Sequence, residues 1–292
     1  MRDRLYRVEA IILKRTDFGE ADRILTLFTP DLGKMRAIAK GARKPSSRKS
    51  GHIELFTYSM LLLAKGRHLD VVTQADTLDA FMPLRVSLER LGYAYYLAEL
   101  LDRFSEEGDP ASRVSSFSRS STVSDVAAEN RPIFDLLLHS LRWLGDVGSD
   151  PALLARYFEL HLLQHVGYQP QLFHCVNCGS PIEPVENFFS SEAGGVIDPL
   201  CMQNQRDKIA GHARDAHPIP VNVLKVLRYL QTREYETVRS LRITPDVQAQ
   251  VELLMYHFLA HHLERNLKSV EFLHQLKQPF LQQGAASEVS AG

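Results

Sequence analysis

The hydrophobic pattern changes its period near residue 81, and this change limits the possible folds more than any other feature of the sequence. Before it, apolar and polar residues alternate in five short segments, at 6–12, 23–29, 35–40, 55–64 and 69–78. A period of two is typical of half-buried β-strands. Turn-forming residues such as Pro30 and Gly33 separate the segments. Five short strands within residues 1–80 indicate a small closed barrel, and the five-stranded OB-fold is the commonest barrel of this size.

After residue 81 the apolar residues recur with helical spacing. Six apolar or small residues share one face of the first predicted helix: Leu84, Leu88, Leu91, Tyr95, Ala98 and Leu101. Further helices are predicted at 132–144, 151–166, 221–231 and 245–267, with a serine-rich connection at 105–124. We therefore expect an α+β multidomain protein. Its OB-fold barrel would span residues 1–80, and its helical domain residues 81–292, interrupted at about 167–218 by an insertion of irregular sequence.

The first part of the chain is basic although the whole chain is almost neutral. Residues 1–75 contain 15 Lys and Arg against 8 Asp and Glu, a net charge of +7, whereas the complete chain carries −1. Seven basic residues and no acidic one lie between Asp31 and Glu54: Lys34, Arg36, Lys40, Arg43, Lys44, Arg48 and Lys49. Such a block favours a polyanion, and nucleic acid is the first candidate because neutralised phosphates release counterions. A solvated basic loop and a surface for an acidic protein remain as alternatives.

Aromatic side chains offer a second way for the barrel to hold nucleic acid. OB-folds commonly bind single strands with a basic groove and with aromatic rings that stack on bases. Phe18, Phe56 and Tyr58 are available for stacking. Aromatic residues serve burial first, so each of the three is a core candidate as well.

Several classes of protein are disfavoured by the sequence. No P-loop or dinucleotide-binding fingerprint occurs, so we expect no nucleotide cofactor. The first ten residues lack the apolar region of a signal peptide, and apolar runs such as 60–64 are too short to span a bilayer. Three cysteines do not make a disulfide framework. These features predict a soluble cytoplasmic protein.

The irregular block contains half of a zinc ribbon, Cys175 and Cys178 followed by Gly179. Cys201 follows at a distance suited to the second half, but Asn204 occupies the position of the fourth ligand. Three imidazoles of the same block could replace it: His174, His212 and His217. We predict a zinc-ribbon-like segment, for which two interpretations stay open. It is a degenerate segment that keeps its turns without metal, or it holds one structural Zn²⁺ on the three cysteines and an unidentified fourth ligand.

A histidine-rich stretch near residue 260 is a weaker metal candidate. His257, His261 and Glu264 share one helical face, with His262 beside them. The zinc-protease motif requires Glu directly after the first His, and Phe258 stands there instead. We therefore expect packed or exposed histidines. A metal-dependent hydrolase built on these or on the cysteines is a rival hypothesis, which a nuclease assay with a chelator would test.

Taken together, residues 5–280 resemble the RecO family of bacterial DNA repair and recombination mediators. The most specific stretches are 16–28 (TDFGEADRILTLF), 33–50 (GKMRAIAKGARKPSSRKS), 175–179 (CVNCG) and 266–273 (NLKSVEFL). Residues 40–48 (KGARKPSSR) are the most diagnostic of these. The resemblance implies an N-terminal OB-fold, a helical C-terminal domain and a zinc-ribbon insertion that some members keep and others lose.

The resemblance also implies a non-enzymatic role. Members of the family bind single- and double-stranded DNA, anneal complementary strands and help RecA to load, together with RecR and the acidic tail of the single-strand-binding protein. They act in the cytoplasm at the nucleoid. The family's DNA-binding loop would fall on the seven basic residues between Asp31 and Glu54, with Arg15 and Arg23 as weaker additions. The alternative is a protein-docking adaptor of a repair complex, whose basic loop meets acidic protein tails rather than DNA.

Overall fold

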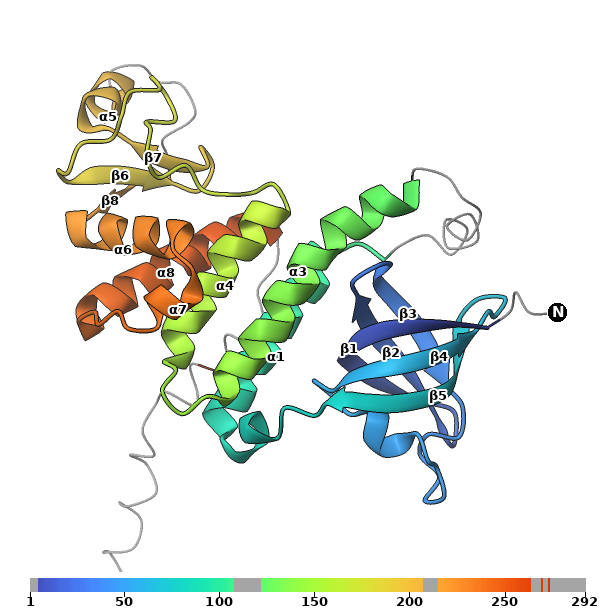
Figure 1. Ribbon diagram of the computed structural model, residues 1–292. Helices are drawn as coiled ribbons and strands as arrows, with labels where there is room; N and C mark the ends of the chain where they lie inside the picture. Colours follow the sequence, from blue (N-terminus) through green and yellow to red (C-terminus); the bar gives the residue numbers. More distant parts are fainter. Residues whose placement is uncertain (1–4, 108–121, 207–214, 264–268, 270–272, 274–292) are drawn as a thin grey trace, which may run out of the picture.

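The protein is arranged as three parts in a row. The computed structural model describes residues 5–107, 122–206, 215–263, 269 and 273. Figure 1 shows a β-barrel, then two long helices, α1 (Leu88–Phe104) and α3 (Thr122–Gly145), and then a group of shorter helices next to a small sheet. The small sheet lies at the end of the molecule far from the barrel. No helix among the described residues combines the length and the apolarity needed to cross a bilayer.

Five strands form the closed barrel: β1 (Leu5–Phe18), β2 (Asp22–Thr29), β3 (Gly33–Ala39), β4 (Tyr58–Ala64) and β5 (Asp70–Asp79). They pair in the order β1-β2-β3-β5-β4, and the short β3–β5 pairing is parallel while the other strand pairs are antiparallel. This barrel, followed by a helical region, confirms the predicted fold class. The first strand extends six residues beyond its predicted end. A bulge between Ile12 and Lys14 interrupts the alternation there without ending the strand.

The barrel has one core inside and shares a second core with the helices. Along β1, the side chains of Ala10 and Ile12 pack inside the barrel. Ile11 and Leu13 belong instead to the large core formed with the helices. Opposite faces of a single strand therefore contribute to two cores, as the period of two requires. This arrangement fixes the barrel against α1 and α3.

The remaining helices are α4 (Pro151–His165), α6 (Val221–Thr232), α7 (Tyr235–Val238) and α8 (Pro245–Leu263), with short 3₁₀ turns η2 (Ser50–Ile53) and η3 (Met82–Val86). The prediction that a helix begins at Pro132 is wrong, because α3 begins ten residues earlier and contains this proline. Proline removes one backbone hydrogen bond inside a helix. Burial of Phe134, Leu137 and Leu141 after it stabilises the helix. Most of the predicted connection at 105–124 lies outside the described residues.

The predicted apolar face of α1 is only partly correct. Leu88 and Tyr95 are exposed, whereas Tyr93, Tyr96 and Leu97 are buried. The helix packs against the barrel, α3 and α4, so it has no single buried face. A pattern based on one face therefore cannot select its core residues.

The block at 167–218 is more ordered than its sequence suggests. It contains β6 (Asn187–Ser190), β7 (Gly195–Ile197) and α5 (Pro199–Arg206), and β8 (His217–Ile219) completes a sheet of order β7-β6-β8. Strands of three or four residues are too short to show a clear alternation of apolar and polar residues. This sheet supports the cysteine segment described below.

Candidate nucleic-acid interface and metal cluster

Strand β3 divides the predicted basic block between two places on the barrel. Lys34 and Arg36 lie on the strand, whereas Lys40 follows its end and begins the loop that carries the other four basic residues. At about 3.3 Å per residue, Lys34 and Lys40 are about 20 Å apart along the strand. The loop and η2 are drawn in mid-blue at the lower edge of the barrel in Figure 1. The block is therefore not one continuous surface.

The two basic residues on β3 connect the barrel to the end of α1. The ammonium group of Lys34 donates to the carboxylate of Asp102 at 3.0 Å and to the main-chain carbonyl of the same residue at 2.5 Å. The guanidinium Nε of Arg36 lies 3.1 and 2.9 Å from the two carboxylate oxygens of Glu107. The side chain of Lys34 is only 15% exposed. Both cations thus already have a carboxylate partner within the chain, and the Arg36 side chain is 51% exposed.

Arg15 and Arg23 are also paired with carboxylates. Arg15 forms an ion pair with Glu54. Arg23 lies 3.2 Å from Asp17 and 3.5 Å from Glu54. These pairs join β1, β2 and the segment after η2. A phosphate that bound here would have to compete with carboxylates that are already in place.

Lys49 is directed at the barrel rather than at solvent. Its ammonium group donates to the main-chain carbonyl of Val72 at 2.9 Å. Burial lowers the pKa of Lys49, and the charge of Asp22 opposes that shift. This lysine therefore fastens the loop to β5.

The other four basic side chains of the block are exposed on the loop, and we call them the basic lip: Lys40, Arg43, Lys44 and Arg48. Arg43 lies 3.4 Å from Asp17. Within the described part of the chain, Lys40, Lys44 and Arg48 have no carboxylate partner. Among the described residues, Lys40, Lys44 and Arg48 thus present unpaired positive charge to a ligand, and Arg43 lies beside them with a carboxylate partner.

The lip is held in place by the turn between β1 and β2. The amide of Arg43 donates to the carbonyl of Ala21 at 2.9 Å, and the amide of Gly41 donates to Asp22 at 2.7 Å. Gly41 has a φ of +66°, which residues other than glycine adopt at a cost. These bonds position the start of the loop, while its charged side chains extend into solvent.

Two of the three predicted stacking residues are unavailable for stacking on bases. Phe56 is 1% exposed and packs edge-on against Tyr95, with ring centres 4.9 Å apart. Tyr58 is half-buried, donates to Glu9 at 2.7 Å and packs edge-on against a phenylalanine of α3. Phe18 differs, because it is 53% exposed. Stacking could thus involve only Phe18 among these three.

A cluster of four possible metal ligands lies at the small sheet: Cys175, Cys178, Asp198 and Cys201. Their ligand atoms all lie within 4.8 Å of one another. Two thiolates bound to one tetrahedral zinc ion at 2.3 Å are about 3.8 Å apart, so one ion fits among the four atoms. Cys175 is buried, and Cys178 is exposed. Three thiolates and one carboxylate could therefore hold a metal ion such as structural zinc.

The fourth ligand is one that the sequence analysis missed. The segment DPLC places Asp198 three residues before Cys201, which is the spacing of a CxxC pair with a carboxylate in the first position. Cys201 is thus the second ligand of its pair, and a ligand at Asn204 is not needed. Neither His174 nor His217 joins the cluster, and position 212 lies outside the described residues. The spacing of DPLC was the signal in the sequence.

The pKa shifts in the cluster favour protonated thiols at Cys175 and Cys201 and a charged carboxylate at Asp198. Burial and the hydrogen bond to Asp198 raise the pKa of the Cys175 thiol, and the same two causes raise that of Cys201. Although burial opposes it, hydrogen bonds from the cysteines hold the pKa of Asp198 well below its usual range. The thiol of Cys178 donates to Asp198 at 3.1 Å. A metal ion would replace these thiol protons, so its affinity should rise with pH.

The histidine-rich stretch does not form a metal site in the described part of the chain. His257 and His261 are exposed, and position 264 lies outside the described residues. His262 packs against Phe258 and Tyr168, with ring centres 4.5 and 4.8 Å away. Burial lowers the pKa of His262. These histidines therefore pack or face solvent, as expected from the sequence.

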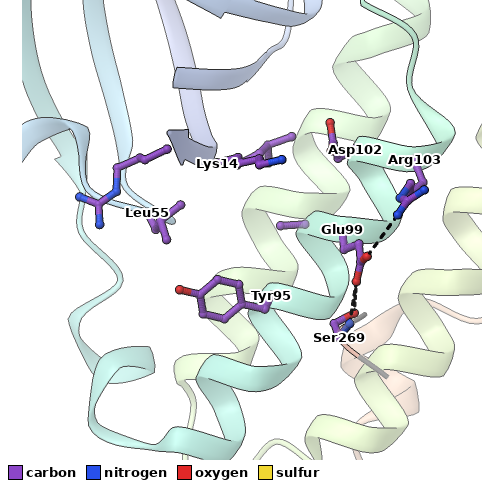
Figure 2. Close-up of a pocket in the computed structure, with 10 residues that line it drawn as sticks. Lys14, Leu55, Tyr95, Glu99, Asp102, Arg103 and Ser269 are labelled. Carbon is purple, nitrogen blue, oxygen red and sulfur yellow. Dashed lines mark hydrogen bonds and ion pairs between the residues drawn. The ribbon is translucent and has the colours of Figure 1, made fainter. Parts of the chain in front are cut away.

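A cavity of about 570 Å³ lies where the barrel meets α1. Figure 2 shows Leu55 and Tyr95 at its side, with Lys14 and Asp102 at its edge. Glu99 accepts hydrogen bonds from the backbone amide and the hydroxyl of Ser269, and it pairs with Arg103 at 3.8 Å. Most of the charges around this cavity are therefore already paired.

Comparison with known proteins agrees with this architecture. The family profile described as "Recombination protein O N terminal" matches residues 1–81, and that of "Recombination protein O C terminal" matches residues 123–271. "DNA repair protein RecO" of Roseiflexus sp. (strain RS-1) is 45% identical over 95% of this chain and 88% of its own. The protein of the same name from Pelotomaculum thermopropionicum is 38% identical over 97% and 99%, and that from Dehalococcoides mccartyi (strain CBDB1) is 36% identical over 93% and 96%. The chain belongs to the Recombination protein O family of DNA repair proteins.

Proposed function

We propose that this protein is a non-enzymatic recombination mediator that binds single- and double-stranded DNA through the basic lip without reading its sequence. The observation that carries the proposal is the position of the lip, an exposed group of cations beside the β1–β2 turn of an OB-fold barrel. Flexible Lys and Arg side chains contact phosphates, which are identical for every base sequence. Family membership in a group of DNA repair proteins supports this choice of polyanion.

The same surface would promote annealing of complementary strands. Two strands repel each other through their phosphates, and a cationic surface lowers this repulsion while the base edges remain free to pair. Annealing by this route requires no catalytic residue. The metal cluster is consistent with the proposal, because a zinc ion with four protein ligands has no open position for water or substrate.

We infer that the partners are RecR and the acidic C-terminal tail of the single-strand-binding protein, and that the assembly helps RecA to load at gaps. The family relationship supports these partners. Binding to chromosomal DNA would place the protein at the nucleoid. The barrel, expected at residues 1–80, would bind DNA through the lip. The helical domain, expected at residues 81–292, would bind the protein partners.

Charge reversal tests the DNA-binding proposal. The double variant Arg43→Glu, Lys44→Glu should weaken binding to unrelated single-stranded and duplex oligonucleotides by similar factors and slow their annealing. Lys225→Glu with Arg233→Glu is the matched control, because it makes the same charge change at exposed positions on and just after α6. A loss confined to one base sequence, or an equal loss in the control, would contradict the proposal. Binding to an acidic peptide but to no oligonucleotide would instead identify a protein-docking adaptor.

The non-enzymatic assignment has a separate test. DNA incubated with the full-length protein and divalent metal should remain intact while it anneals. Strand cleavage that a chelator abolishes would show a metal-dependent nuclease and overturn the assignment. Annealing should be equally fast with and without ATP, because the sequence contains no P-loop.

A further inference from the structure

Phe18 is the aromatic residue of the described barrel strands whose side chain is exposed. It lies at the end of β1 and is 53% exposed. The other aromatic side chains of the barrel strands, such as Tyr6, Phe28 and Tyr58, are buried or half-buried. Exposed apolar rings cost free energy in water, because their hydration is unfavourable. An exposed ring at a fixed position is therefore a candidate for a binding role.

Contacts on both sides of Phe18 connect it to the basic lip. The residue before it, Asp17, lies 3.4 Å from the guanidinium of Arg43. The residue after it, Gly19, accepts a hydrogen bond from the same guanidinium at 3.4 Å. The amide of Arg43 also donates to Ala21 in the same turn. Asp22, which pairs with Phe18 across the two strands and shares its face, accepts a hydrogen bond from the amide of Gly41 at the start of the loop, so Phe18 and the lip are adjacent.

The turn that follows Phe18 keeps this surface open. Gly19 has a φ of +58°, and no atom lies within 4 Å of the position that a Cβ would occupy. Phe18 pairs with Asp22 in the last pair of the β1–β2 ladder. The backbone under the ring is thus fixed by the ladder, while the space around the turn is free for a ligand.

We propose that Phe18 is a stacking platform for an unpaired base, and that it gives the basic lip a preference for single-stranded over duplex DNA. This inference rests on the proposed DNA binding and specifies which form of DNA the lip prefers. A splayed base of a single strand can stack on the ring while neighbouring phosphates meet Lys40, Lys44 and Arg48. Bases inside a duplex are already stacked and paired, so they gain nothing from the ring. One stacked base contributes about 5- to 150-fold in affinity.

Three variants of the full-length protein test the role of the ring. Phe18→Ala should bind a single-stranded oligonucleotide at least about fivefold more weakly than the wild-type protein does, while its affinity for a duplex should stay unchanged. Phe18→Trp should keep single-strand affinity, because indole also stacks on bases. Leu5→Ala is the matched control, since Leu5 is 54% exposed at the opposite end of the same strand. The salt dependence of binding should stay the same in Phe18→Ala, because stacking releases no counterions.

A fluorescent base analogue that is quenched by stacking gives a direct readout. Placed within the single strand, it should be quenched by the wild-type protein and by Phe18→Trp, but much less by Phe18→Ala at saturating protein. Wild-type-like affinity and quenching in Phe18→Ala would overturn the inference and leave DNA binding by the lip intact. Equal losses on single strand and duplex would overturn it as well. Failure of the wild-type protein to bind either form would instead refute the proposed function itself.

Discussion

The salt dependence of the affinity for single-stranded DNA should report how many cationic side chains contact phosphates. Each neutralised phosphate of a single strand contributes about −0.7 to the slope of log K against log salt concentration. The three lip cations without a carboxylate partner in the described structure, Lys40, Lys44 and Arg48, predict a slope of about −2.1, and about −2.8 if Arg43 exchanges Asp17 for a phosphate. All seven basic residues of the block would give about −4.9. The structure favours the smaller values, because the remaining three cations of the block already have acceptors within the chain: Lys34, Arg36 and Lys49.

Two substitutions with identical chemistry test this division. Lys44→Gln removes an exposed cation, so the slope should become shallower by about 0.7 while stability stays unchanged. Lys34→Gln should keep the slope but lower the free energy of unfolding by about 1–3 kcal/mol, because Asp102 loses a charged hydrogen-bond donor at 3.0 Å. Binding titrations at several salt concentrations and urea unfolding measure the two effects. A wild-type slope near −5, or equal changes of slope in both variants, would refute the reasoning.

Other parts of the structure give further predictions. Asp198→Ala should reduce the zinc that copurifies with the protein, measured by elemental analysis, because three ligands remain; an unchanged content would exclude Asp198 as a ligand. Glu159→Ala should lower the free energy of unfolding by about 3–5 kcal/mol, because buried Arg156 loses its partner at 2.6 Å; a wild-type urea midpoint would contradict this. Burial lowers the pKa of His161, so the unfolded chain takes up a proton first and stability should fall as pH drops below about 6.5. Thermal unfolding against pH should show a weaker fall in His161→Gln, and an identical fall would exclude His161 as its cause.

The barrel was predictable from sequence because its signals are local. Alternation and turn residues identify five strands, and the number of strands then favours closure. The same local signals did not identify the core residues of α1, because tertiary packing determines which of its side chains are buried. Leu88 looked like a core residue of α1 but is exposed, because this helix is buried by neighbours on several sides rather than along one stripe.

The functional surfaces were only partly predictable, because partners far apart in the sequence select the residues that remain free. In the sequence, Lys34 and Arg36 belong to the same run of basic residues as the lip. Their carboxylate partners lie 68 and 71 residues further along the chain, so the sequence does not reveal these pairs. Asp198 was overlooked for a different reason. A carboxylate in place of a thiolate does not match a cysteine motif, although its spacing to Cys201 is that of the motif.

The most direct test of DNA binding by the basic lip compares the wild-type chain with one variant in which all four lip residues are replaced by glutamine: Lys40, Arg43, Lys44 and Arg48. Affinity is measured for several single-stranded oligonucleotides of unrelated sequence at low salt. The account predicts similar affinities of the wild-type protein for all of them and a loss on every one in a variant that unfolds at the wild-type temperature. Wild-type affinity in that variant, or a wild-type protein that ignores all the oligonucleotides, would contradict it.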